Sequence, residues 1–224
     1  MLVDFQKNNG LLPDGKLGEK TAKKMREVFK MTIFEAAHFL GQGSVESDFF
    51  QLKRESGNYS VALLRSTFSY YRDRPQEAYA DGRGVNEKSL SIQRQKIIFN
   101  KVYDDKNRKP GYKLGNTKIG DGWLFRGNAA GQTTGREEHQ DLANHLKDQS
   151  IMTNPDVVWD KYYFEAFIFY LKSKNVFGKM KDVSRQSCNT VTLAINGKAM
   201  MHALLRYERT QHYYNLLNLP DAKK

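Results

Sequence analysis

The chain has 224 residues, of which 39% are hydrophobic and 12% aromatic. This apolar content supports a sizeable core and excludes extensive disorder. The 36 Lys and Arg residues outnumber the 25 Asp and Glu residues and give a formal net charge of +11, which favours an acidic partner such as nucleic acid, an anionic membrane surface or an anionic cell-wall polymer.

The first residues, "MLVDFQKNNGLLPDG", lack the basic start and the long apolar segment of a signal peptide. The most apolar run, residues 162 to 171, is interrupted by Glu165 and is shorter than the ~20 residues that cross a bilayer. We therefore expect synthesis in a reducing cytoplasm without a signal peptide and without membrane insertion. If the protein acts outside that cytoplasm, something else must carry or release it there.

The N-terminal segment is expected to form a short helix, a turn around Pro13 to Gly15, and a second helix capped by Thr21 or a residue just before it. Next, Thr32 and Glu35 have the spacing of a capping box, which predicts a helix from residue 33 to about residue 42.

Gly41 and Gly43 are expected to end this helix. Glu46 therefore lies at or just beyond the C-terminal end of a largely buried helix.

The middle of the chain, residues 71 to 122, is polar and contains one helical segment, residues 90 to 103. Residues 104 to 123 have several glycines and one proline, which predicts a long loop. The apolar stretch "VVWDKYYFEAFIFYLKSKN" predicts one central core helix. Two more helices follow, separated at Asn196 and Gly197. Strand signals are weak, so the predicted fold class is mainly α, with a single core, long loops and little or no sheet.

Two glutamates, Glu46 and Glu55, could form a working carboxylate pair, because glycosidic hydrolysis requires one protonated and one ionised carboxyl group. Glu46 has apolar neighbours such as Phe49, which predicts a raised pKa, whereas the cations of Lys53 and Arg54 are expected to keep Glu55 ionised. The alternative is that both are ordinary solvated residues at helix ends.

The stretch "GDGWLFRGNAAGQTTGR", residues 120 to 136, combines five glycines with aromatic, amide and hydroxyl side chains. It lacks the Gly-Lys-Ser/Thr ending and the preceding strand of a phosphate-binding loop. Trp123, Arg126, Gln132 and Thr134 suit a sugar-binding cleft, while the alternative is a structural loop whose glycines adopt positive φ.

No metal or cofactor site is predicted. The five histidines show no metal-ligand spacing with carboxylates. The single cysteine, Cys188, excludes an intramolecular disulfide and a cysteine-based metal site.

Six stretches occur in an order and spacing typical of one family: "AAHFLGQGSVES", "ESGNYS", "IIFNKVYDDKNRKPGYKLGN", "GDGWLFRGNAAGQTTGR", "FEAFIFYLKSKN" and "VTLAING". From residue 32 to residue 214 the chain resembles phage and bacterial lysins with a catalytic domain of glycoside hydrolase family 19, the chitinase-like group. The resemblance implies a lysozyme-like or chitinase-like fold and hydrolysis of the β-1,4 glycan of peptidoglycan, with inversion.

The resemblance also implies residue roles. Glu46 corresponds to the general acid, Glu55 to the general base and Thr134 to the residue that holds the attacking water. Inversion places the two carboxyl groups roughly 6.5–9.5 Å apart. The substrate-binding roles fall on Tyr59, Ser60, Trp123, Arg126, Gln132 and Asn196.

Several positions depart from the family pattern. Val45 replaces the histidine that usually precedes the acid, Glu138 and His139 replace an asparagine and an aromatic residue, and Lys198 replaces the second glycine of an Asn-Gly-Gly motif. These departures keep an alternative open, in which the chain is a weakly active or inactive structural protein of a phage tail or baseplate. A third hypothesis, nucleic-acid binding, depends only on the charge. Because the basic residues are scattered among acidic ones, no specific nucleic-acid partner is predicted.

Residues 1 to 30, with "FQKNNGLLPDGKLGEKT", resemble part of a peptidoglycan-binding repeat. We therefore expect a short helical segment over residues 1 to 30 and the catalytic domain over residues 31 to 224. The expected partners are bacterial cell-wall peptidoglycan and, under the alternative, other virion proteins. The resemblance also implies action at the cell wall, after release from the (host) cytoplasm or as part of a virion.

Overall fold

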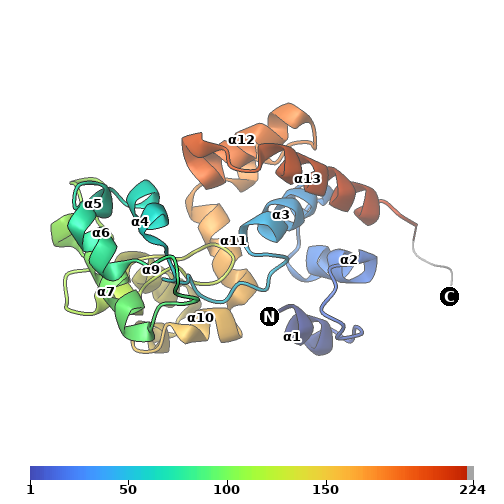
Figure 1. Ribbon diagram of the computed structural model, residues 1–224. Coiled ribbons are helices and arrows are strands. Elements are labelled where there is room, and N and C mark those ends of the chain that lie inside the picture. Colours follow the sequence, from blue (N-terminus) through green and yellow to red (C-terminus); the bar gives the residue numbers. More distant parts are fainter. Residues whose placement is uncertain (221–224) are drawn as a thin grey trace. The chain divides into compact units, whose positions relative to one another are not determined.

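The computed structural model describes residues 1–220, which are mainly helical (Figure 1). Within these residues the only β-type pairings are three isolated bridges, Arg54 with Asn128, Ser60 with Arg83, and Asn128 with Thr133. The predicted fold class, mainly α with little or no sheet, is confirmed. No helix of the described chain combines the length and the apolar content needed to cross a membrane.

The chain divides into two compact units. Unit 1 contains Met1–Leu52, Ala129–Gly131 and the chain from Tyr163 onward, and unit 2 contains Lys53–Asn128 and Gln132–Tyr162. The helices of unit 1 are α1 (Leu2–Asn8), α2 (Glu19–Val28), α3 (Ile33–Glu46), α11 (Tyr163–Ser173), α12 (Arg185–Asn196) and α13 (Ala203–Leu217), with the short 3-10 turns η3 (Phe177–Lys179) and η4 (Gly197–Ala199).

The two predicted N-terminal helices are present as α1 and α2, and the turn between them is organised by the buried amide of Gln6. Its Nε2 donates to Asp14 Oδ1 at 2.9 Å and to Thr21 Oγ1 at 3.0 Å, while its Oε1 accepts from the backbone N–H of Gly15 at 2.8 Å. Thr21 lies inside α2, and the N-cap is Gly18. The hydroxyl of Thr21 therefore fixes the turn instead of capping the helix.

Helix α3 begins as predicted. Thr32 Oγ1 accepts from the backbone N–H of Glu35 at 3.2 Å, and Glu35 Oε2 accepts from the N–H of Thr32 at 2.8 Å. The capping box is confirmed, and Glu46 is the last helical residue, as expected.

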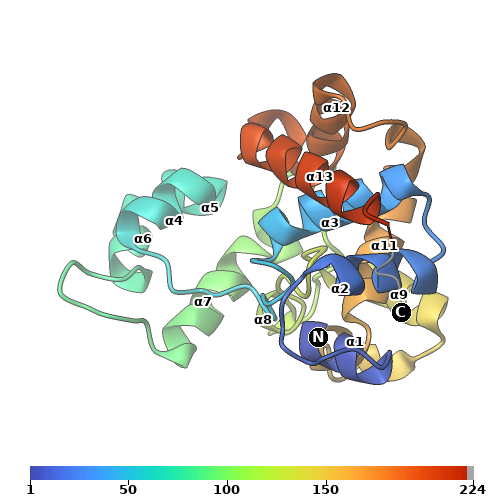
Figure 2. The same ribbon diagram turned by 90° about the vertical axis from the view of Figure 1, so that its right-hand side faces the viewer.

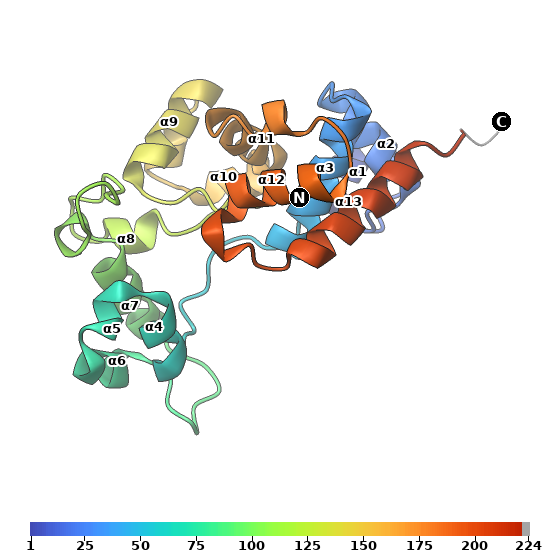
Figure 3. The ribbon, with the colours of Figure 1, turned by 90° about the horizontal axis from the view of Figure 1, so that it is seen from above.

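The prediction that Gly41 and Gly43 end α3 is wrong, because both lie inside the helix. A Cβ atom at Gly41 would lie 2.4 Å from Thr210 Oγ1, and one at Gly43 would lie 2.5 Å from the ring of Phe50. The two glycines therefore permit close packing, and α13 runs side by side with α3 (Figures 1 and 3).

The single core helix predicted around residue 165 is also wrong, because the segment forms α10 (Asp156–Lys161) in unit 2 and α11 in unit 1. The backbone leaves the helical region at Tyr162, where φ is −117° and ψ is 27°. The hydroxyl of Tyr162 donates to Asp148 Oδ2 at 2.8 Å in unit 2, whereas that of Tyr163 donates to the carbonyl of Leu52 at 3.0 Å in unit 1. Of these two consecutive tyrosines, Tyr162 is therefore anchored in unit 2 and Tyr163 in unit 1.

Helix α11 supplies the core of unit 1. Its Phe167 is fully buried and packs against Phe39 and Phe50, with ring centroids 5.1 and 6.4 Å apart. The predicted break at Asn196 and Gly197 is confirmed, since α12 ends at Asn196.

The helices of unit 2 are short: α4 (Val61–Thr67), α5 (Ser69–Arg72), α6 (Pro75–Asp81), α7 (Ile92–Val102), α8 (Asp121–Leu124), α9 (Arg136–Leu146) and α10, with the 3-10 turns η1 (Asp105–Asn107) and η2 (Gln149–Met152). Helices α4 to α7 form a cluster (Figure 2) whose core includes Leu64, Tyr71, Ile98 and Phe99. The helix predicted over residues 90 to 103 is present as α7.

The predicted long loop after α7 contains only one turn of 3-10 helix and α8, and buried polar side chains fix its course. Asp105 Oδ1 accepts from the N–H of Leu114 at 2.8 Å, and Asn116 Nδ2 donates to the carbonyl of Tyr103 at 2.9 Å. These contacts bring the loop back to the end of α7.

Candidate active site

Glu55 in unit 2 lies at the centre of a hydrogen-bonded cluster. Tyr59 donates its hydroxyl to Oε1 at 2.9 Å, and Tyr103 donates to Oε2 at 2.8 Å. The backbone N–H of Gly127 also donates to Oε2, at 3.3 Å. Three different segments therefore hold this one carboxyl group.

Burial raises the pKa of Glu55 above its usual value, and the hydrogen bonds from Tyr103, Tyr59 and Gly127 and the charge of Arg126 offset part of this rise. Burial therefore outweighs the neighbouring cations, which were expected to favour the ionised form of Glu55. Neutral hydroxyl groups contact its carboxyl oxygens directly. Burial also raises the pKa values of Tyr59 and Tyr103, so both stay protonated donors at neutral pH.

A basic and aromatic wall continues from this cluster. The guanidinium of Arg126 stacks on the ring of Trp123, with 3.6 Å between Cζ and the ring centroid, and its Nε donates to the carbonyl of Glu55 at 3.3 Å. Arg54 is largely buried and donates to the carbonyl of Leu124 at 2.6 Å. Burial lowers the pKa of Arg54 to about 10, so it remains charged at neutral pH.

The glycine-rich loop brings Gln132 near Glu55, and Thr134 follows two residues later. A Cβ atom at position 127 would lie 2.3 Å from Gln132 Oε1 and 3.1 Å from Glu55 Oε2, so the glycine lets the loop pass close to both side chains. Thr134 donates its hydroxyl to the carbonyl of Gln132 at 2.5 Å, which leaves its oxygen as an acceptor for a further hydrogen bond.

Ser60 has a local structural role, because its hydroxyl accepts from the N–H of Leu63 at 3.2 Å and caps α4. Its predicted contact with a substrate stays a prediction.

Glu46 in unit 1 contacts a buried arginine. Arg206 is 2% exposed, and its Nη1 lies 2.8 Å from Glu46 Oε1. The same nitrogen donates to Gln42 Oε1 at 3.0 Å, and Gln42 Nε2 donates to Thr192 Oγ1 at 3.1 Å. Glu46 and Gln42 are four residues apart on α3 and share one face of the helix.

The apolar setting predicted for Glu46 is wrong, since a guanidinium lies beside its carboxyl group. Arg206 reaches it because Arg206, Thr210, Tyr213 and Leu217 form the buried stripe of α13. A side chain that is charged on such a stripe needs a charged or polar partner. The spacing of four, three and four residues could have revealed Arg206 in the sequence.

Asn196 also lies in unit 1, where its Oδ1 accepts from the N–H of Met201 at 2.6 Å. This bond closes the turn between α12 and α13.

The structure thus distributes the predicted residues over two groups. Unit 2 brings together Glu55, Tyr59, Trp123, Arg126, Gln132 and Thr134, and unit 1 contains Glu46 and Asn196. The predicted separation of the two carboxyl groups stays a prediction. Sequence reasoning missed Tyr103 and Arg206. Tyr103 contacts Glu55 across 48 positions of the chain, and no local pattern marks such a contact.

Two further buried titratable groups have pKa values that burial shifts. Burial raises the pKa of Cys188 to about 11, which makes it a poor nucleophile at neutral pH. Burial lowers the pKa of His139 to about 4, and its Nδ1 lies 2.8 Å from the carbonyl of Gly135. Within residues 1–220 no group of three or more His, Cys, Asp or Glu side chains gathers as metal ligands would.

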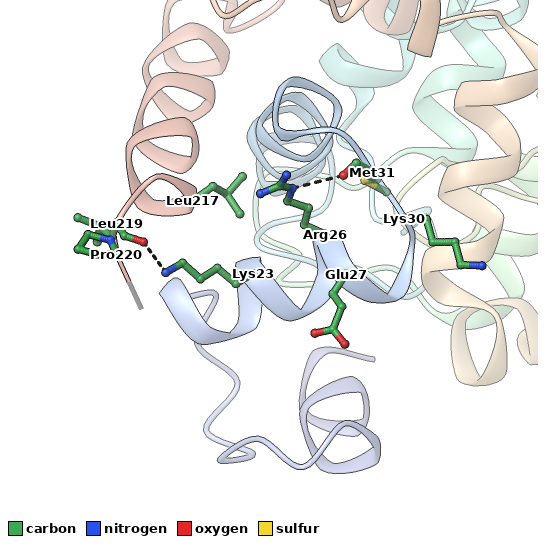
Figure 4. Close-up of a pocket in the computed structure, with 8 residues that line it drawn as sticks. All are labelled: Lys23, Arg26, Glu27, Lys30, Met31, Leu217, Leu219 and Pro220. Carbon is green, nitrogen blue, oxygen red and sulfur yellow. Dashed lines mark hydrogen bonds between the residues drawn. The ribbon is translucent and has the colours of Figure 1, made fainter. Parts of the chain in front are cut away.

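Unit 1 also has a hollow of about 670 Å³ beside α2 and the end of α13 (Figure 4). There Lys23 Nζ donates to the carbonyl of Leu219 at 2.6 Å, and Arg26 Nε donates to that of Met31 at 3.4 Å. Neither Glu46 nor Asn196 lines it. These hydrogen bonds connect α2 to the segment that follows α13 and to Met31, the residue just before the N-cap of α3.

Comparison of the chain with models of protein families gives no match, and comparison with curated proteins gives none either.

Proposed function

We propose that this protein is a glycoside hydrolase that cleaves β-1,4 bonds of bacterial peptidoglycan, with Glu46 and Glu55 as its two carboxylates. The observation that carries the proposal is the setting of Glu55. A buried carboxyl group with a raised pKa, next to an aromatic and cationic wall, is typical of catalytic sites.

The proposed roles follow the resemblance: Glu46 donates the proton to the leaving oxygen and Glu55 activates water. A carboxylate with a raised pKa is a stronger base once ionised, which supports the role of Glu55. Thr134 accepts a hydrogen bond from that water. Trp123 and Arg126 offer a ring face and hydrogen-bond donors to a sugar, and Gln132 offers an amide.

Tyr59 and Tyr103 are positioning residues in this proposal. Each fixes one oxygen of Glu55, so the carboxylate presents a defined lone pair to water. The net charge of +11 favours association with an anionic wall.

The test measures new reducing ends released from purified peptidoglycan. We expect Glu46→Gln and Glu55→Gln each to reduce the rate by about 100-fold or more. The matched controls are Glu165→Gln in unit 1 and Glu137→Gln in unit 2, both exposed on helices, and these should retain the wild-type rate.

Equal release by wild type and Glu46→Gln would reject the role of Glu46. No release by wild type from several peptidoglycans would reject the hydrolase and support the alternative of a structural virion protein with virion partners. The anomeric configuration of the new end, read by NMR, tests inversion.

A further inference from the structure

Unit 2 has a second hollow, of about 350 Å³, beside α5 and the loop that follows α7. Aromatic and basic side chains dominate its wall: Phe68, Tyr70, Arg108, Lys109 and Tyr112. Neither Glu55 nor Trp123 nor Arg126 lines it, and no acidic residue does. The hollow is therefore separate from the cluster around Glu55 and carries positive charge.

The two cations of this hollow are Arg108, which backbone carbonyls hold in place, and the exposed Lys109. Arg108 Nε donates to the carbonyl of Tyr112 at 2.5 Å, and its Nη1 donates to that of Val102 at 3.1 Å. Lys109 is exposed. Within residues 1–220 neither cation forms an ion pair with a carboxylate. Both charges are thus available to an anionic ligand, and Arg108 is already fixed in place.

The apolar part of the wall leads to Glu55. The ring of Phe68 contacts those of Tyr59 and Tyr103 edge to face, with centroids 5.1 and 6.2 Å apart. These two tyrosines hold the oxygens of Glu55. The hollow therefore lies one side chain away from the groups that position the candidate catalytic carboxylate.

We propose that this hollow binds a short acidic peptide, with its carboxylates on Arg108 and Lys109 and its aliphatic carbons on Phe68 and Tyr112. This inference deepens the proposed function and rests on it, because peptidoglycan carries short peptides with free carboxylates along its glycan. Chitin is neutral and has no such peptide. Occupation of the hollow would thus select peptidoglycan over chitin.

Binding is tested with the soluble peptide N-acetyl-L-Ala-γ-D-Glu-L-Lys, a tripeptide with two carboxylates and one ammonium, and with ¹⁵N-labelled full-length protein at about 150 mM salt, where non-specific attraction is screened. We expect saturable shifts of the amide signals around Phe68 and Tyr112. Lys109→Glu should weaken this binding by about fivefold to tenfold, because a repulsion replaces an attraction. Lys113→Glu, an exposed change in the same loop but outside the hollow, should leave it unchanged.

Two results would overturn the inference: no saturable shifts with the tripeptide, or equal weakening by Lys109→Glu and Lys113→Glu. Chitotriose is the neutral probe, and shifts in the hollow with it that match those with the tripeptide would reject an acidic ligand.

Hydrolysis of glycan strands stripped of peptide separates this inference from the proposed function. Cleavage of stripped glycan without tripeptide binding rejects the hollow alone, and tripeptide binding without any cleavage rejects the hydrolase alone. If both proposals hold, Lys109→Glu lowers kcat/KM on intact peptidoglycan by about fivefold to tenfold but leaves it unchanged on stripped glycan.

Discussion

Units 1 and 2 each remove a glutamate carboxyl group from water, and they do so differently. In unit 1 a buried guanidinium faces Glu46, so a full positive charge compensates the carboxylate. In unit 2 two neutral tyrosine hydroxyls face Glu55, and they compensate burial only in part, so its pKa rises. In both units the groups that contact the carboxyl oxygens come from distant parts of the fold or from other segments, and not only from the adjacent residues in the chain.

The largest effect is expected from removing the charged partner in unit 1. Arg206→Leu leaves the carboxyl group of Glu46 without its charged partner and Gln42 Oε1 without its donor, which should lower the free energy of unfolding by about 3 kcal/mol. Denaturant unfolding measures this loss. Arg185→Leu, on the exposed face of α12, is the matched control and should change stability by less than about 0.5 kcal/mol. A loss no greater than that of the control would show that the ion pair contributes nothing.

A smaller loss should follow when the helices that carry this pair are forced apart. In Gly41→Ala the new Cβ would lie 2.4 Å from Thr210 Oγ1 and 2.7 Å from Thr210 Cα. Because α3 and α13 must separate, we expect a loss of about 2 kcal/mol in unfolding free energy. In Gly84→Ala the nearest atom lies 3.6 Å away, so this control should be nearly neutral. Equal stability of the two variants would contradict the tight contact.

Unit 2 should respond to the loss of one neutral donor. Tyr103→Phe removes a hydrogen bond that favours the ionised form of Glu55, so the pKa of Glu55 should rise further. At a pH where Glu55 is ionised, the variant should lose about 1 kcal/mol of stability. The rising limb of the activity–pH profile, which reports ionisation of the base, should also move to higher pH. Activity–pH profiles and pH-dependent unfolding measure both effects.

The control for this change is Tyr79→Phe, which removes an exposed hydroxyl from α6 and should alter neither profile. An unchanged profile in Tyr103→Phe would mean that the hydroxyl does not influence the titration of Glu55.

The subtlest test concerns pH and stability. Because the folded-state pKa of Glu55 lies above its usual value of 4.5, the folded state binds the proton more tightly than the unfolded state. Glu55 therefore favours folding below about pH 4.5, and this contribution is lost as the pH rises through the raised pKa. Glu55→Gln removes the cost of burying a charge, so the variant should melt above wild type at neutral pH and close to it near pH 4.

Each melting temperature is compared between the two proteins at the same pH. His139, whose pKa is lowered to about 4, destabilises both proteins equally as the pH falls below its usual value, and its effect cancels in the difference. A wild type more stable than Glu55→Gln at neutral pH would contradict the raised pKa.

Local patterns in the sequence predicted local structure well. The capping box of Thr32 and Glu35, the break after Asn196 and the loop after α7 are all present, because contacts within a few residues decide them. The glycines at positions 41 and 43 and the split at Tyr162 were not predictable, because contacts with distant residues decide these.

Local patterns along the chain were sufficient to predict a mainly helical fold and a buried helix that ends at Glu46. Together with the family resemblance, they placed Glu55, Trp123, Arg126 and Gln132 in one candidate site. The environment of each carboxyl group depends instead on contacts between distant parts of the chain. Arg206 reaches Glu46 from α13, and Tyr103 reaches Glu55 from the end of α7. Hydrogen bonds form through space between groups about 3 Å apart. The residues next to a carboxyl group in the sequence therefore do not determine its environment.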